Sequence, residues 1–69
     1  MSEADKNIRF DHQIIIKWVE KGTRVLDLGC GDGVLLELLI KNRGCHGTGV
    51  EIDEKAIYRC MEKGLTVSH

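Results

Sequence analysis

The sequence has no proline, only three aromatic residues and only three cysteines among its 69 positions. The cysteines Cys30, Cys45 and Cys60 are odd in number and form no CxxC pair, which argues against a disulfide framework and a zinc site. We expect all three to be reduced, partly buried thiols. With so few aromatic rings, any core has to be built from aliphatic side chains.

Long apolar runs and charge of one sign are also missing. The longest apolar stretch, Val34 to Ile40, is interrupted by Glu37 and is too short to cross a bilayer. Ten Lys and Arg residues balance eleven Asp and Glu, and no basic run suggests nucleic-acid binding. Residues Met1 to Asn7 are polar and unlike a signal peptide. We therefore expect a cytoplasmic protein that binds neither membrane nor nucleic acid.

The composition is that of a globular protein, because 42% of the residues are hydrophobic and 30% are charged. The length, however, is about half that of a typical domain. A chain this short has difficulty offsetting roughly 1.5 kcal/mol of ordering entropy per residue with one small core. Either its stability is marginal, or it buries apolar surface against something absent from this sequence.

Helical and strand-like segments alternate along the chain after a flexible leader, residues 1–9. This order predicts an α/β fold with right-handed crossovers, the N-terminal half of a doubly wound, Rossmann-like parallel sheet over residues 10–69. We expect Trp18 of the first helix to lie in the core. The expected elements are a helix from an Asp11 cap to about Glu20, a strand Thr23–Leu28, a helix Val34–Asn42, a strand His46–Ile52, a helix Glu54–Lys63 and a strand Leu65–Ser68.

A glycine-rich turn, Gly29-Cys30-Gly31-Asp32-Gly33, follows the first expected strand. Ligands of such sheets bind outside the carboxyl ends of the strands, and glycines there let a ligand touch the main chain. The dinucleotide fingerprint G-x-G-x-x-G would need glycine at position 34, which is Val34. The spacing is instead G-x-G-x-G, with Asp27 two residues ahead of the first glycine.

An acidic residue, Glu51, stands 22 positions after Gly29 at the end of the second expected strand. A carboxylate there can accept hydrogen bonds from both ribose hydroxyls of a nucleoside. Gly47 and Gly49 in that strand suggest a close approach by another group, and would keep the sheet surface open. The turn and the acid together predict a nucleoside-containing ligand.

These residues carry a family resemblance. The run from Val25 to Gly33, VLDLGCGDG, resembles the first motif of the class I S-adenosylmethionine-dependent methyltransferases, and GVEID, from Gly49 to Asp53, is similar to their second-strand motif. With Asp11 and the Ile15 to Trp18 segment included, the stretch from about Phe10 to Ser68 resembles the N-terminal part of the methionine-biosynthesis MetW family.

The resemblance implies a site for S-adenosylmethionine or S-adenosylhomocysteine and assigns no catalytic or metal-binding residue. The methionine part would lie against the glycines of the turn, Asp27 would help to hold its amino group, Glu51 would take the ribose hydroxyls and Ile52 would flank the adenine. The implied cofactor-binding residues are Asp27, Gly29, Cys30, Gly31, Gly33, Glu51 and Ile52.

Plainer interpretations stay open beside these roles. Asp27 could cap amides of the turn, and Glu51 could be a solvated residue at a strand end. We expect Asp32 and Asp53 to cap helices and His12 to be a surface residue. Cys30 has no cationic neighbour in sequence that would lower its pKa, so a nucleophilic role is not expected.

The resemblance also implies a role in methionine biosynthesis, through methyl transfer or as an interaction module that partners a homoserine acyltransferase. The family continues beyond His69, with further strands that complete the pocket and carry the acceptor site. We therefore expect this chain to be a fragment without turnover of its own. Its exposed sheet edges and apolar second helix predict that the chain either self-associates or is partly molten.

Overall fold

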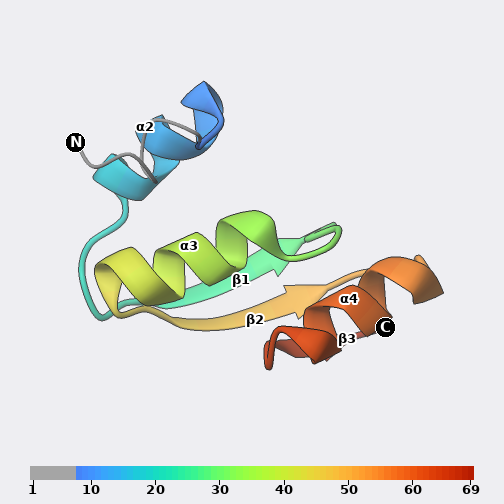
Figure 1. The fold of residues 1–69 in the computed structure, drawn as a ribbon. Helices are drawn as coiled ribbons and strands as arrows, with labels where there is room; N and C mark the ends of the chain where they lie inside the picture. Colours follow the sequence, from blue (N-terminus) through green and yellow to red (C-terminus); the bar gives the residue numbers. More distant parts are fainter. Residues whose placement is uncertain (1–7) are drawn as a thin grey trace.

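The computed structural model describes residues 8–69 as a three-stranded parallel sheet with helices over one face (Figure 1). The strands lie in the order β1-β2-β3, with Leu26 beside Thr48 and Thr48 beside Thr66. The expected α/β fold is confirmed; most of the expected leader, residues 1–7, lies outside the described residues. The elements are α2 (Phe10–Trp18), β1 (Arg24–Leu28), α3 (Val34–Arg43), β2 (His46–Val50), α4 (Glu54–Glu62) and β3 (Thr66–Ser68).

The helix ends follow from local sequence. Helix α3 ends at Gly44, whose φ of 62° is a left-handed conformation that favours glycine. Helix α4 begins after Asp53, whose carboxylate accepts the amide of Ala56 at 3.3 Å, as the capping prediction required. These two ends fix the strand–helix–strand path that brings the carboxyl ends of β1 and β2 to the same edge of the sheet.

The core lies between the sheet and helices α3 and α4. Its buried side chains include Leu36 and Leu39 of α3 and Cys60 of α4. A Cβ atom at Gly47 would collide with the Leu36 side chain, and one at Gly49 would collide with the Cys30 sulfur. The two strand glycines therefore admit the helix and the turn to the sheet. The expectation that they keep the sheet surface open was wrong, because protein side chains fill that space.

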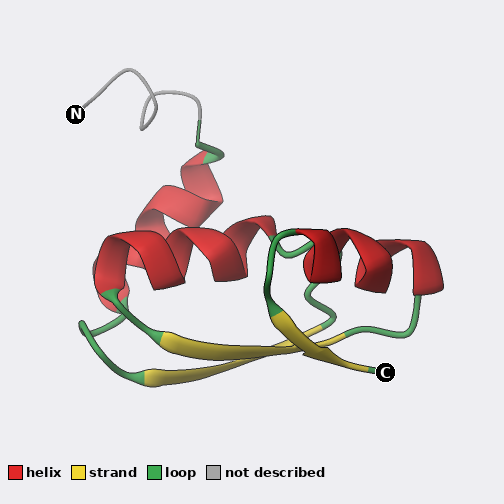
Figure 2. Ribbon diagram, turned by 60° about the horizontal axis from the view of Figure 1, so that its bottom comes forward, coloured by secondary structure: helices red, strands yellow, loops and turns green. Residues whose placement is uncertain are grey.

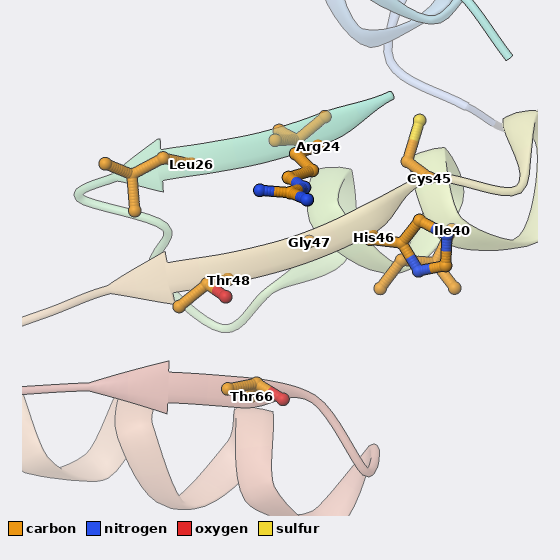
Figure 3. A pocket seen from close by; sticks show the side chains of 9 residues that line it. Arg24, Leu26, Ile40, Cys45, His46, Gly47, Thr48 and Thr66 are labelled. Carbon is orange, nitrogen blue, oxygen red and sulfur yellow. The ribbon is translucent and has the colours of Figure 1, made fainter. Parts of the chain in front are cut away.

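None of the helices within residues 8–69 covers the other face of the sheet, as Figure 2 shows. Leu26 and Leu28 of β1 project from it and are 63% and 73% exposed. The apolar sequence of β1 is typical of a strand whose sheet is covered on both faces, but the described residues cover only one face. A hollow of about 670 Å³ is lined by residues of the three neighbouring strands, among them Arg24, Thr48 and Thr66. Figure 3 shows these side chains on the strands that carry them.

Helix α2 departs from two expectations. It begins after Arg9 and ends at Trp18, so Asp11 lies in its first turn and is not its N-cap. Trp18 is 81% exposed, because α2 packs against α3 with its isoleucines half-buried and leaves the last residue of the helix outside the contact. The prediction that Trp18 belongs to the core was wrong. No helix within residues 8–69 is long and apolar enough to span a membrane.

Candidate functional site

The glycine turn lies at the carboxyl ends of β1 and β2 and is held to β2 by backbone hydrogen bonds. The amides of Gly29 and Cys30 both donate to the carbonyl of Val50, at 2.8 and 3.1 Å. Gly29 and Gly31 have φ values of 70° and 60°, and a Cβ atom at either would meet no atom within 4 Å. Their Cα atoms therefore face open space that a ligand can occupy.

Glu51 joins the end of β2 to the same turn. Its Oε1 accepts the amide of Gly31 at 2.7 Å, and its Oε2 accepts the amides of Ile52 at 3.1 Å and Asp53 at 3.0 Å. Hydrogen bonds from the amides of Asp53 and Gly31 lower the pKa of Glu51 from its ordinary value. The structure thus brings Glu51 to the turn, as an ionised carboxylate next to Gly31.

Gly33 has a different surrounding from the other two glycines of the turn. Its φ is 85°, and a Cβ atom there would collide with Leu65 and stand 3.0 Å from the Cys60 sulfur. The residue is buried against α4 and the start of β3. Packing within the protein therefore requires a glycine at position 33, whereas Gly29 and Gly31 border open space.

A pocket of about 500 Å³ opens at the turn. Four predicted residues line it, together with two at the start of α2 that were not predicted as site residues. The other predicted residues, Gly33, Glu51 and Ile52, lie outside the lining of this pocket, and Ile52 is 79% exposed. The lining includes Asp27, Gly29, Cys30 and Gly31 together with Arg9 and His12.

Asp27 lies on the helix-covered side of β1 and is half-buried. Burial raises the pKa of the Asp27 carboxyl, and the charge of nearby His12 opposes that shift. No hydrogen bond from another described residue to this carboxylate is present, so the capping interpretation of Asp27 gains no support. Its acceptor oxygens are available to a ligand in the pocket.

Cys30 is the thiol of the pocket. Its sulfur lies 3.9 Å from that of Cys60, which in turn donates to the carbonyl of Gly31 at 3.2 Å. Burial, the hydrogen bond with Cys60 and the nearby acids raise the pKa of the Cys30 thiol to about 11. A thiol of this kind is protonated at neutral pH, which agrees with the expectation that it is not a nucleophile.

His12 was expected to be a surface residue and lies instead in the wall of the pocket. Arg9 immediately precedes α2, and His12 lies in the first turn of that helix. The sequence did not indicate which side of the helix meets the turn.

Comparison with known proteins places this geometry in a family. A family model described as "Methionine biosynthesis protein MetW" matches residues 9–69. The chain belongs to the MetW family. The expected resemblance is confirmed, and the relatives below place MetW among the class I S-adenosylmethionine-dependent methyltransferases.

Curated relatives of this MetW chain are methyltransferases. It is 40% identical over 47 residues to the ubiquinone biosynthesis O-methyltransferase of Aromatoleum aromaticum, covering 61% of this chain and 20% of the relative. It is 42% identical over 46 residues to the ribosomal protein L11 methyltransferase of Lachnospira eligens, covering 67% and 14%. The MetW chain thus spans a fifth or less of the length of these two proteins.

A solved structure shows the same fold. The S-adenosylmethionine-dependent methyltransferase of Geobacter sulfurreducens, determined in complex with S-adenosyl-L-homocysteine, matches with a TM-score of 0.63 and 32% sequence identity. The match covers 90% of this MetW chain and 29% of that protein. The arrangement of helices on one face of a parallel sheet is therefore also found in a methyltransferase of known structure.

Proposed function

We propose that this chain forms the S-adenosylmethionine-binding part of a methyltransferase-like MetW protein that acts in methionine biosynthesis. The proposal rests on the hydrogen bond from the amide of Gly31 to the carboxylate of Glu51, which places an ionised carboxylate beside an open glycine turn. The site would also bind S-adenosylhomocysteine, the product of methyl transfer. The structurally similar methyltransferase of Geobacter sulfurreducens was solved in complex with that compound, which supports the proposal.

The residues of the pocket and the neighbouring residues Glu51 and Ile52 fit such a ligand group by group. Open space over Gly29 and Gly31 admits a chain of methylene groups and sulfur against the backbone. Among the described residues, Oε1 of Glu51 accepts one amide only, and a carboxylate oxygen offers about two lone-pair sites, so a ribose hydroxyl can donate to it. The half-buried carboxylate of Asp27 suits an ammonium group, and exposed Ile52 offers an apolar side to a purine.

The bound sulfonium would supply an activated methyl group for transfer to a nucleophile. The contribution of this chain is to bind and orient, since fixing reacting groups in place is the main requirement of such a displacement. Cys30 takes no part as a nucleophile, because its thiol stays protonated. We assign no role in binding a methyl acceptor to any of the described residues.

Calorimetric titration with S-adenosylhomocysteine tests the proposal. Glu51→Ala removes the ribose acceptor and the contact to Gly31, and we expect affinity to fall at least tenfold, since hydrogen bonds to a charged group are worth roughly 1.5–3 kcal/mol. Glu54→Ala, which removes an exposed acid in the first turn of α4, is the matched control and should bind like the unaltered chain. Equal affinities for all three would contradict the proposal.

A second candidate is a non-catalytic interaction module that partners a homoserine acyltransferase. The uncovered sheet face favours it, because Leu26 and Leu28, two positions apart on β1, are both exposed there. A pull-down with purified homoserine acyltransferase separates the two candidates. Retention of the partner by Glu51→Ala and its loss with Leu28→Asp would support the module; no retention by the unaltered chain would exclude it.

We also propose that the chain self-associates through the same face, because Leu26 and Leu28 are exposed there. A cytoplasmic location completes the proposal, since the charge is balanced and the cysteines are free thiols. Sedimentation of the chain as a monomer at high concentration would contradict self-association.

A further inference from the structure

The end of α4 holds the glycine turn, although the residues of this helix are absent from the lining of the pocket at the turn. Figure 2 shows the end of α4 beside the start of α3. The Cys60 sulfur donates to the carbonyl of Gly31 at 3.2 Å, and Nζ of Lys63 donates to the carbonyl of Asp32 at 2.9 Å. Two successive carbonyls of the turn are therefore held by donors three positions apart at the end of one helix.

These contacts orient the peptide groups of the turn. No peptide bond within residues 8–69 is cis, and in a trans peptide the N–H points away from the preceding carbonyl. Because the carbonyl of Gly31 faces Cys60, the amide of Asp32 faces away from α4. This amide donates to no acceptor among the described residues, and Asp32 lines the pocket. The hold from α4 thus leaves a donor of the turn on the side that a ligand can reach.

Cys60 is packed directly against the turn. Its side chain is fully buried, and its sulfur stands 3.0 Å from the position that a Cβ atom would take at Gly33. The Cys30 sulfur lies 3.9 Å from it, so Cys30 can donate its proton to Cys60 while Cys60 donates its own to Gly31. The two thiols and the Gly31 carbonyl then form one hydrogen-bonded chain at the turn.

Lys63 is exposed, in contrast to Cys60, and forms no ion pair within residues 8–69. Its ammonium group instead reaches the Asp32 carbonyl, 31 positions earlier in the sequence. Replacing an exposed side chain leaves no cavity in the core, so this contact can be removed with little disturbance of the packing.

We infer that Cys60 and Lys63 are positioning residues, which hold the glycine turn in the conformation that binds the ligand. They act through the carbonyls of Gly31 and Asp32, and neither side chain lines the pocket. The inference rests on the proposed function and adds to it the part of α4 that keeps the turn competent. When the contacts are lost, the apparent affinity falls by the fraction of chains whose turn leaves that conformation.

Calorimetric titration of Lys63→Met with S-adenosylhomocysteine tests the exposed donor. We expect the Kd to rise about fivefold, the factor that a typical single hydrogen bond contributes. Lys55→Met removes the same charge from another exposed position of α4, one without an ion pair among the described residues, and should bind like the unaltered chain. Lys63→Arg keeps a donor and should restore part of the affinity.

The buried donor is tested by Cys60→Ala, with Cys45→Ala as its control. Cys45 is also buried, but its sulfur contacts Thr23 and the carbonyl of Glu20 and not the turn. Both variants leave a cavity and should lower the unfolding temperature. Only Cys60→Ala should also raise the Kd.

Thermal unfolding of the same preparations separates positioning from a structural role. A structural contact would lower the unfolding temperature, while the folded chain kept the Kd of the unaltered protein. An unchanged Kd for Lys63→Met, or a rise that Lys55→Met shares, would overturn the inference and leave the proposed function in place. Failure of the unaltered chain to bind S-adenosylhomocysteine would overturn the proposed function and the inference with it.

Discussion

The carboxylate of Glu51 accepts the amide of Gly31 at 2.7 Å, and so ties the end of β2 to the middle of the glycine turn that follows β1. The same side chain accepts the amides of Ile52 and Asp53 through its other oxygen. One acid therefore sets the position of both segments that border the candidate ligand site.

The acid dependence of stability should reflect this carboxylate. Because its amide partners lower the pKa of Glu51 in the folded chain, its contribution to stability is present above the ordinary value of about 4.5 and is lost as the pH falls through the lowered value. Glu51→Gln should lower the unfolding temperature at pH 7 and flatten its decline in acid. Thermal unfolding followed by circular dichroism between pH 2 and 7 measures both, with Glu54→Gln as the control. An acid profile of Glu51→Gln that superimposes on that of the unaltered chain would contradict the assignment.

Asp27 should behave in the opposite sense. Burial raises the pKa of this carboxyl, so its ionised form opposes folding at neutral pH and its protonation favours folding. Asp27→Asn should therefore raise the unfolding temperature at pH 7 or leave it unchanged, while weakening S-adenosylhomocysteine. Stability and affinity measured on the same preparation separate these effects. A variant that is less stable yet binds normally would show that Asp27 serves the fold and not the ligand.

Two glycines of the turn should respond differently to alanine. Gly33→Ala forces a side chain into a left-handed conformation and against Leu65 and Cys60, which should cost about 3 kcal/mol of unfolding free energy. Gly31→Ala meets open space and should cost only about 1 kcal/mol, while obstructing the ligand. Urea unfolding compares the two variants. Equal losses of stability would contradict the distinction between a packing glycine and a ligand-facing one.

The thiol of Cys30 should be unreactive in the folded chain. Raising its pKa from an ordinary 9.0 to about 11 lowers the thiolate fraction at pH 8 roughly a hundredfold. Alkylation with iodoacetamide, located by mass spectrometry, should be correspondingly slow in buffer and fast in urea, where the thiol recovers its ordinary pKa. Rapid alkylation of Cys30 in the native chain would contradict the burial of this sulfur beside Cys60.

The features that could be predicted from the sequence are those that depend on residues close together along the chain. The order of elements, the Asp53 cap and the left-handed turn with glycines at 29 and 31 all follow from short-range spacing. Glu51 was also predicted, because parallel strands place their carboxyl ends at one edge, whatever packs against them.

Burial was harder to predict because it depends on which surfaces meet. Trp18, Leu26 and Leu28 have the apolar character of core residues, yet all three are exposed because no described element covers them. His12 was missed for the related reason that the packing of α2 on α3 decides which side of that helix faces the pocket. Gly47 was assigned to a ligand surface when its neighbour is Leu36 of α3.

Amide NMR of the chain during titration with S-adenosylhomocysteine shows whether the glycine turn binds this ligand. If it does, the shifts saturate and cluster at Gly29, Gly31 and Glu51, with His12 affected from α2. A well-dispersed spectrum in which these amides ignore the ligand would contradict the proposed function, and would leave the uncovered sheet face as the functional surface of the chain.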